Sequence, residues 1–183
     1  RLVKSLARLS AQLKKTIVSD YGKVRAVRLA QQVEKIANTL LNEYGDDMIA
    51  GLKEFGADEA EFAKQAILAT TAAEAVSSPS IRQIQASITK TPMKLIVGKK
   101  TKILTIEQAA KSFSENRSKE IAQIIRDGST IGKTSQEIVR DINEIVNGKI
   151  RNQAASLVRT STNHIGNIAR SATYAANDDV IIG

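Results

Sequence analysis

The chain has 183 residues, no cysteine, one histidine, 42% apolar residues and only 3% aromatic residues. The lack of cysteine excludes disulfides, thiolate zinc sites and cysteine nucleophiles. Two prolines and no tryptophan predict long helices around a core of Leu, Ile, Val and Ala, and they argue against an all-β fold. No apolar run approaches the roughly 20 residues that span a bilayer, so no membrane association is expected.

The net charge of +8 is unevenly distributed along the chain. Residues 1–28 hold eight Lys and Arg against one acid, residues 29–76 hold three against nine, and residues 77–119 hold nine against two. Such blocks favour contact with polyanions or with oppositely charged protein surfaces. Mutual neutralisation of basic and acidic helices within the fold is the alternative, and the sequence leaves both open.

Apolar residues at spacings of three and four predict a first helix over residues 2–21 and a second over residues 23–44. The apolar face of the first helix should consist of Leu2, Leu6, Leu9, Leu13 and Ile17. Glycine commonly follows the last residue of a helix, so we expect the second helix to stop at Gly45. A short amphipathic piece around residues 48–52 should follow.

Asp58 and Glu61 have the spacing of a capping box, which predicts a third helix from Asp58 to about Val76. Its apolar positions are Phe62, Ala66, Ala69, Ala73 and Val76. A short helix is expected before Thr91-Pro92, on the isoleucines Ile81, Ile84 and Ile88.

The second half of the chain differs by holding two β-branched runs around Gly98-Lys99-Lys100. These runs predict a small β-hairpin at about residues 94–106. A helix over residues 106–127 should end at Gly128, and the capping box T-S-Q-E should begin the next helix at Thr134 and end at Gly148. The last helix, residues 150–176, should bury Ile150, Ala154, Leu157, Ser161, Ile165, Ile168, Ala172 and Ala175. Residues 180–183 resemble a strand.

These elements define the expected fold class. It is mainly α, an elongated multi-helix assembly with one small β-hairpin.

Catalytic patterns are weak in this sequence. His164 has polar neighbours at helical spacing, but no acid lies within 13 residues of it and no G-x-S-x-G turn exists. G-S-T-I-G-K-T at 128–134 has three residues where a phosphate-binding loop needs four, and no strand precedes it. We therefore expect no enzyme, no cofactor and no metal site.

Basic side chains offer candidate contacts to DNA or another anion. On the predicted hairpin these are Lys94, Lys99, Lys100 and Lys102, and on the first helix they are Arg8, Lys14 and Lys15. The chain has no aromatic stacking platform and no base-reading motif, so such binding should be nonspecific and salt-dependent.

The last helix carries a polar ridge formed by Arg159, Asn163, Asn167 and Arg170, about four residues apart. Residues 152–177 contain neither Glu nor Lys, the residues that usually cover a solvated helix face. This composition favours a specific polar packing role over simple solvation.

The run L-V-R-T-S-T-N-H-I-G-N-I-A-R-S-A-T-Y resembles the signature helix of phage head morphogenesis proteins, the minor head proteins typified by the F protein of phage Mu. The matching positions are Arg159, Thr160, Asn163, Asn167, Ala169 and Arg170. The preceding glycine-containing turn and helix start also match, at Gly128, Gly132, Ser135, Glu137 and Ile138. Thr162 stands where the family often has an acid.

The resemblance covers about residues 91–183, and it divides the chain into an N-terminal helical region, 1–90, and a central region, 91–183, with a further domain expected after Gly183. It implies a non-enzymatic minor structural protein of a tailed-phage head. Such a protein would be assembled in the host cytoplasm, would reside in the virion head and would support head assembly, DNA packaging or ejection. Its partners would be the portal protein, other head proteins and packaged DNA, with several copies around a symmetric ring.

Under this resemblance, Arg159, Thr160, Asn163, Asn167 and Arg170 would serve partner or interdomain packing. Two other interpretations stay open. One is a nonspecific nucleic-acid-binding helical module, and the other is the helical scaffold of an enzyme whose active domain follows Gly183.

Overall fold

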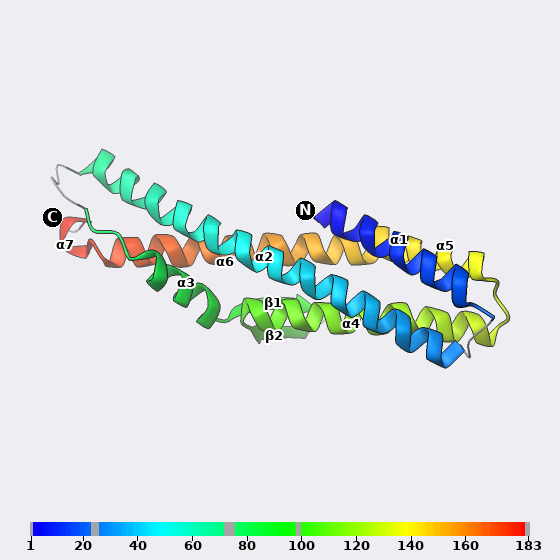
Figure 1. Ribbon diagram of the computed structural model, residues 1–183. Helices are drawn as coiled ribbons and strands as arrows, with labels where there is room; N and C mark the ends of the chain where they lie inside the picture. Colours follow the sequence, from blue (N-terminus) through cyan, green and yellow to red (C-terminus); the bar gives the residue numbers. More distant parts are fainter. Residues whose placement is uncertain (1, 23–25, 72–75, 98–99, 182–183) are drawn as a thin grey trace. The chain divides into compact units, whose positions relative to one another are not determined.

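The computed structural model describes residues 2–22, 26–71, 76–97 and 100–181 (Figure 1). It is mainly α with one small antiparallel hairpin, which confirms the predicted fold class. The helices are α1 Leu2–Asp20, α2 Ala26–Thr70, α3 Ile81–Lys90, α4 Ile106–Thr130, α5 Ser135–Ile145, α6 Arg151–Ala175 and α7 Asp178–Ile181. The strands β1 Met93–Val97 and β2 Lys100–Leu104 lie between α3 and α4, and the π-helical turn Val146–Ile150 joins α5 to α6.

The chain packs as two compact units, each built from two separate stretches. Unit 1 comprises Arg1–Asp46 and Ala109–Leu157, and unit 2 comprises Asp47–Gln108 and Val158–Gly183. The expected division at residue 90 rests on the family resemblance rather than on packing, so it stays a prediction.

Unit 1 is a helical bundle with an aliphatic core. The predicted face of α1 is buried at Leu6, Leu9, Leu13 and Ile17, with Leu2 partly buried beside it. α1 packs against α5 (Figure 1). The other core residues come from α2, α4, α5 and the π turn, and the largest fully buried ones are Leu29, Ile121, Ile125, Ile138, Ile142 and Ile150.

The expected stop at Gly45 is wrong, because α2 continues without a break to Thr70. Asp58 therefore lies inside a helix and caps none. The glycines of α2 serve close packing instead. A Cβ at Gly45 would lie 3.3 Å from Ala110 Cβ, and one at Gly56 would lie 2.5 Å from Ile88 Cδ1. In a helix, a buried glycine removes side-chain bulk and lets neighbouring side chains approach closely.

The apolar face predicted for residues 58–76 is also wrong. Phe62 and Ala69 are exposed and Ala66 is only half-buried, whereas Ala60, Ala63 and Ile67 are buried. The predicted face was set by a helix that begins at Asp58. In the continuous α2, however, the buried face is set by the earlier residues Met48, Leu52 and Gly56 and continues from them. Ala73 lies outside the described residues.

The end of α4 lies beyond the predicted Gly128. Gly128 is inside the helix and buried, and a Cβ there would lie 2.9 Å from Ile138 Cγ1. The stop is Gly132, which has a φ of +74°. The Lys133 N–H donates to the Gly128 carbonyl at 2.8 Å and the Gly132 N–H to the Ser129 carbonyl at 3.2 Å. This pair of bonds is a Schellman cap, whose left-handed position glycine fills without strain.

The predicted capping box at Thr134 is confirmed as the start of α5, whereas the expected stop at Gly148 is wrong. Instead, the π turn carries the chain directly into α6. The buried positions Ile138, Ile142, Val146, Ile150 and Ala154 recur every four residues. Such a row drifts around a helix of 3.6 residues per turn, and one wider turn returns it to the core side.

In α6 the predicted inner stripe is confirmed for Ala154, Leu157, Ser161 and Ile165. Nearer the end the buried residues are Ala169 and Thr173, whereas Ile168 and Ala172 are half-buried and Ala175 is exposed. The stripe that was expected to include Ala172 and Ala175 is therefore wrong in its last turns. The strand expected from residue 180 is wrong for its described part, because Asp178–Ile181 is a short helix.

The core of unit 2 combines aliphatic side chains with glycine, alanine and small polar residues. Beside Gly56 lie Ile84 and Ile88 of α3 and Ile165 of α6. Ser80 caps α3 with a capping box closed by Gln83. Ile81 is exposed, while Ile84 and Ile88 are buried as predicted.

Among the helices that the structure describes, none combines the length and the apolar character needed to cross a bilayer.

Candidate functional site

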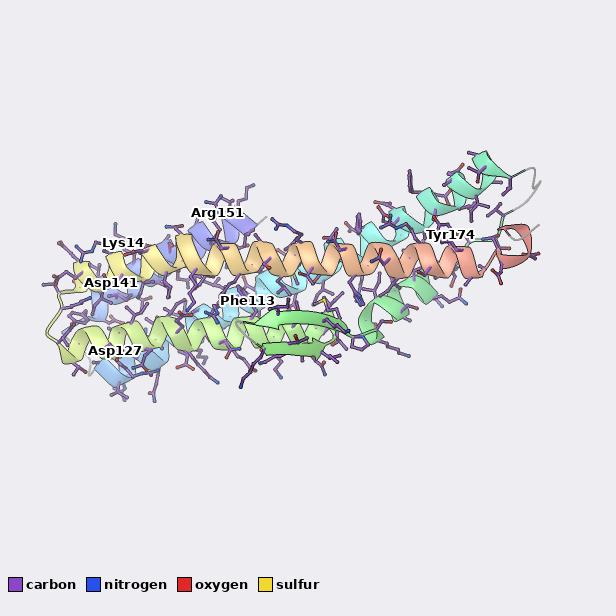
Figure 2. All side chains as sticks on the ribbon, turned by 180° about the vertical axis from the view of Figure 1, so that it is seen from behind. Lys14, Phe113, Asp127, Asp141, Arg151 and Tyr174 are labelled. Atoms are coloured by element: carbon purple, nitrogen blue, oxygen red, sulfur yellow. The ribbon has the colours of Figure 1, made fainter. Side chains whose placement is uncertain are left out.

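The polar ridge of α6 is mainly exposed. Arg159, Asn163 and Asn167 follow one another at four-residue spacing and all three are exposed, so they form one row about one helical turn apart. Within the described residues, none of the three side chains makes an intramolecular hydrogen bond or ion pair. In Figure 2 the labelled residues Arg151 and Tyr174 mark the two ends of α6, and the row lies on the helix between them. The row is therefore available to a partner.

The fourth ridge residue, Arg170, is turned onto its own unit. Its Nε atom lies 3.5 Å from Glu59 Oε2 and donates to the Gly166 carbonyl at 3.1 Å. The Glu59 side chain is 23% exposed and the Arg170 side chain 43%, so solvent screens the pair only in part. Arg170 therefore holds α6 to α2 within unit 2.

Thr160 is half-buried, and the residues just after it attach the hairpin to α6. The Ser161 hydroxyl lies 3.6 Å from Met93 Sδ. His164 Nε2 lies 3.2 Å from the Thr91 carbonyl and, as the N–H partner, donates to it. The bond from His164 to Thr91 anchors the hairpin to α6, a role that only the fold reveals.

The hairpin lysines are exposed, as a contact surface requires. Lys94, Lys100 and Lys102 lie on paired strands in the register Lys94↔Ile103, Leu95↔Lys102 and Val97↔Lys100. Lys99, which was also expected to contact anions, lies outside the described residues. Cross-strand partners share a face, so Lys94 and Ile103 lie together on one face and Lys102 lies on the other.

The basic residues of α1 divide into two kinds. Lys14 and Lys15 are exposed. The Arg8 guanidinium lies 2.8 Å from the Glu43 carboxylate of α2, with both side chains at least half exposed. An intramolecular carboxylate therefore balances part of the expected cationic surface. A shallow depression along this face is lined by Arg8, Ala11, Gln12, Lys15, Thr16, Ser19 and Asp20.

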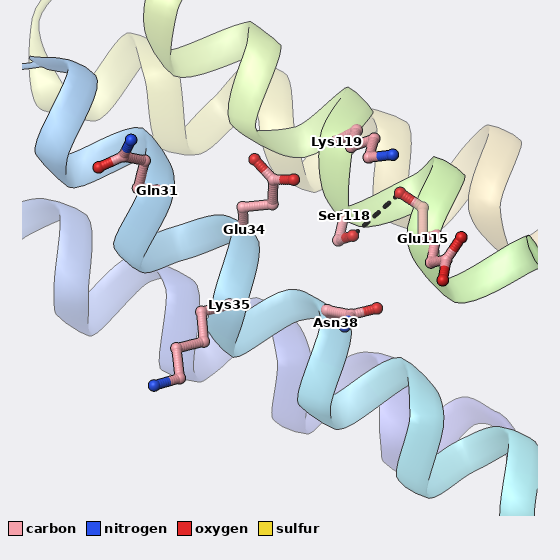
Figure 3. Close-up of a pocket in the computed structure, with 7 residues that line it drawn as sticks. All are labelled: Gln31, Glu34, Lys35, Asn38, Glu115, Ser118 and Lys119. Atoms are coloured by element: carbon pink, nitrogen blue, oxygen red, sulfur yellow. Dashed lines mark hydrogen bonds between the residues drawn. The ribbon is translucent and has the colours of Figure 1, made fainter. Parts of the chain in front are cut away.

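An open hollow of about 520 Å³ lies between α2 and α4 of unit 1 (Figure 3). Its lining is polar and mixed in charge and consists of Gln31, Glu34, Lys35, Asn38, Glu115, Ser118 and Lys119. The Ser118 hydroxyl donates to the Glu115 carbonyl at 3.1 Å, so this hydroxyl is engaged in its own helix. Asn38 Oδ1 has no hydrogen-bond partner among the described residues.

The remaining chemical candidates are engaged in structural roles. Lys133, in the segment that resembles a phosphate loop, lies 2.5 Å from the Asp141 carboxylate, and its N–H closes the cap of α4. Burial raises the pKa of Tyr44, which keeps its phenol neutral. Across the described ranges, no three His, Asp or Glu side chains gather as metal ligands would.

Comparison of the chain with protein-family models, with curated proteins and with solved structures finds no match. The candidate surfaces therefore rest on their own geometry and on the resemblance of the α6 sequence.

Proposed function

We propose that this chain is a minor structural protein of a tailed-phage head that docks on the portal and supports head assembly, DNA packaging or ejection. The observation that carries the proposal is the exposed row Arg159, Asn163 and Asn167 on α6. These three residues belong to the motif that resembles the head morphogenesis family.

The chemistry of this row supports a protein interface. Arginine and asparagine side chains can each donate several hydrogen bonds, and arginine is enriched at the centres of protein interfaces while lysine and glutamate are depleted. Residues 152–177 hold no Glu and no Lys. A non-enzymatic role is part of the proposal.

The test is a pull-down of the purified chain by the portal protein encoded in the same genome, at low and at high salt and with duplex DNA as competitor. Binding should survive both treatments, and the double variant Arg159→Ala/Asn163→Ala should lose it. The matched control is Asn152→Ala/Ser156→Ala, two exposed positions of α6 outside the row. Unchanged binding by the ridge variant would refute the proposal.

The alternative function is a nonspecific nucleic-acid-binding module. The exposure of Lys14, Lys15, Lys94, Lys100 and Lys102 favours it. It predicts affinity for duplex DNA that falls steeply with salt, with no portal retained in the pull-down.

A further inference from the structure

The outer face of the hairpin is apolar and uncovered. Ile96 is 81% exposed and Ile103 is 65% exposed. The register Lys94↔Ile103 and Ile96↔Thr101 places all four residues on one face of the hairpin, because side chains alternate along each strand and cross-strand partners share a face. Ile96 and Ile103 are diagonal neighbours on that face, close enough to form one patch.

The opposite face holds the hairpin to its own unit. Met93 is buried at 3% exposure and accepts the contact from Ser161, and the neighbouring Thr91 carbonyl accepts a bond from His164. This anchoring fixes which face looks outward. The outward patch therefore consists of Ile96 and Ile103 with Lys94 on the same face, whereas Lys100 and Lys102 lie on the opposite face.

A second exposed apolar side chain, Phe62, lies on the part of α2 that belongs to unit 2. The exposed acids near it have the opposite charge to the hairpin lysines. Phe62 is 66% exposed. Asp58 lies one helical turn before it, and Glu54 and Glu61 are exposed nearby in the same helix. Glu59 is engaged with Arg170 and Glu61 lies 3.7 Å from Lys64, so Glu54 and Asp58 are the acids of this patch without an ion pair among the described residues.

We propose that a second copy of this chain covers the hairpin, inserting Phe62 of its α2 between Ile96 and Ile103. The acids Glu54 and Asp58 of that copy would face Lys94, the lysine that shares the hairpin face with the two isoleucines. Both patches are exposed in one copy, so they do not cover each other within a single molecule. The hairpin face and the α2 surface therefore complement each other both in apolar contact and in charge.

The interface is heterologous, because it joins two different patches of identical chains. A dimer keeps one patch of each kind unoccupied, so association continues head to tail and gives a closed ring or an open filament. Lys94, beside the exposed isoleucine pair, would also suit a contact with DNA. An apolar pair at the centre, however, gains nothing from phosphates, and this favours a protein partner.

Complementation between two blocked variants tests the proposal. Phe62→Ser removes the inserted residue and leaves the hairpin intact, while Ile96→Ser/Ile103→Ser removes the hairpin patch and leaves Phe62. Each variant alone should self-associate at least about tenfold more weakly than the unchanged chain, measured by sedimentation equilibrium. A mixture of the two should form one-to-one dimers that stop there.

Ile131→Ser is the matched control, since Ile131 is 70% exposed and lies in the other unit; it should leave self-association unchanged. Far-UV circular dichroism should show the same helix content for all variants, because each substituted side chain is exposed. Raising the salt concentration should weaken association, and Lys94→Glu should be rescued by Asp58→Lys in the partner variant.

Two outcomes would overturn the proposal. One is self-association of the Phe62 variant at full strength, which would mean symmetric hairpin-to-hairpin pairing. The other is a chain that stays monomeric at all concentrations and binds duplex DNA through the hairpin. The measurement needs no portal protein, so its failure and a failure of the proposed function are separate results.

Discussion

Asn177 ties the end of α6 to the segment that precedes α3. It is only 2% exposed, and its Oδ1 accepts from the Ser77 N–H at 2.7 Å. Its Nδ2 donates to the Ser77 carbonyl and to the Thr173 carbonyl, both at 2.7 Å. One amide therefore satisfies backbone groups 100 residues away in the sequence. This contact cannot be predicted from the sequence, because nothing local identifies Ser77 as the partner of Asn177.

Replacing Asn177 should destabilise the chain. Asn177→Ala leaves the Ser77 groups and the Thr173 carbonyl without this partner, at a cost of about 1–3 kcal/mol. Asn177→Asp should cost more, since a carboxylate accepts but cannot donate to the two carbonyls and its charge would be buried. Urea denaturation measures both. Asn167→Ala, at an exposed position of the same helix, is the control and should change the free energy of unfolding by less than about 0.5 kcal/mol.

At the residue scale, the sequence alone does not show whether a glycine ends a helix or allows close packing inside one. Gly45 and Gly128 are predicted as helix ends, yet each lies inside a helix at a close approach to another side chain. Gly132 is a true helix end, with a positive φ. The two uses are alike in sequence. They differ in what lies beside the glycine, and distant parts of the chain supply that.

Helix starts carry stronger local signals than helix ends. The Thr134 hydroxyl accepts from the Glu137 N–H at 3.3 Å, and the Glu137 carboxylate accepts from the Thr134 N–H at 2.7 Å. All four groups lie within four residues, so the sequence predicts the start of α5 correctly. The continuity of α2 and the π turn before α6 depend instead on which positions the core buries. Neither feature is therefore predicted from the sequence.

The capping box should make the stability of α5 depend on pH. The backbone N–H and the hydroxyl of Thr134 both donate hydrogen bonds to the Glu137 carboxylate. These bonds, the backbone one more than the other, lower the pKa of that carboxyl below its ordinary 4.5. The folded pKa lies below the unfolded one, so the ionised carboxylate stabilises the folded state. This contribution is complete above the unfolded pKa and is lost as the pH falls through the folded pKa.

Glu137→Gln removes this dependence. The unchanged chain should be the more stable of the two near neutral pH, and the difference should shrink below pH 4.5. Thermal denaturation across a pH series measures it. Glu144→Gln, an exposed acid of the same helix outside the cap, serves as the control. A difference that does not change between neutral and acid pH would contradict the assigned carboxylate bonds.

At the scale of the whole molecule, each packing unit is assembled from both halves of the chain. The core of unit 1 joins residues 6–41 to residues 121–150. In unit 2, Gly56 of α2 lies beside Ile165 of α6, and the Thr173 hydroxyl lies 3.5 Å from the Ala60 carbonyl. The amphipathic faces can be predicted from sequence, but their pairing cannot, because periodicity gives the direction of a face and not its partner.

This arrangement predicts the behaviour of the two halves when they are separated. Residues 1–90 alone would expose the core faces of α1 and α2, including Leu9, Leu13 and Leu29, which are at most 1% exposed in the whole chain. Uncovering side chains of this size costs about 1.5–3 kcal/mol each, so several of them exceed the stability of a typical domain. The fragment should aggregate or lose its cooperative thermal transition.

Residues 1–90 and 91–183 expressed together should form a one-to-one complex that regains helix content and a single melting transition. Size-exclusion chromatography and circular dichroism measure both properties. The control is a complex in which Leu13→Asp places a charge in the core of unit 1; it should assemble poorly, because a buried carboxylate has no partner there. If residues 1–90 alone gave a monomer with a cooperative transition, the division at residue 90 would be a true domain boundary and the interleaved units would be wrong.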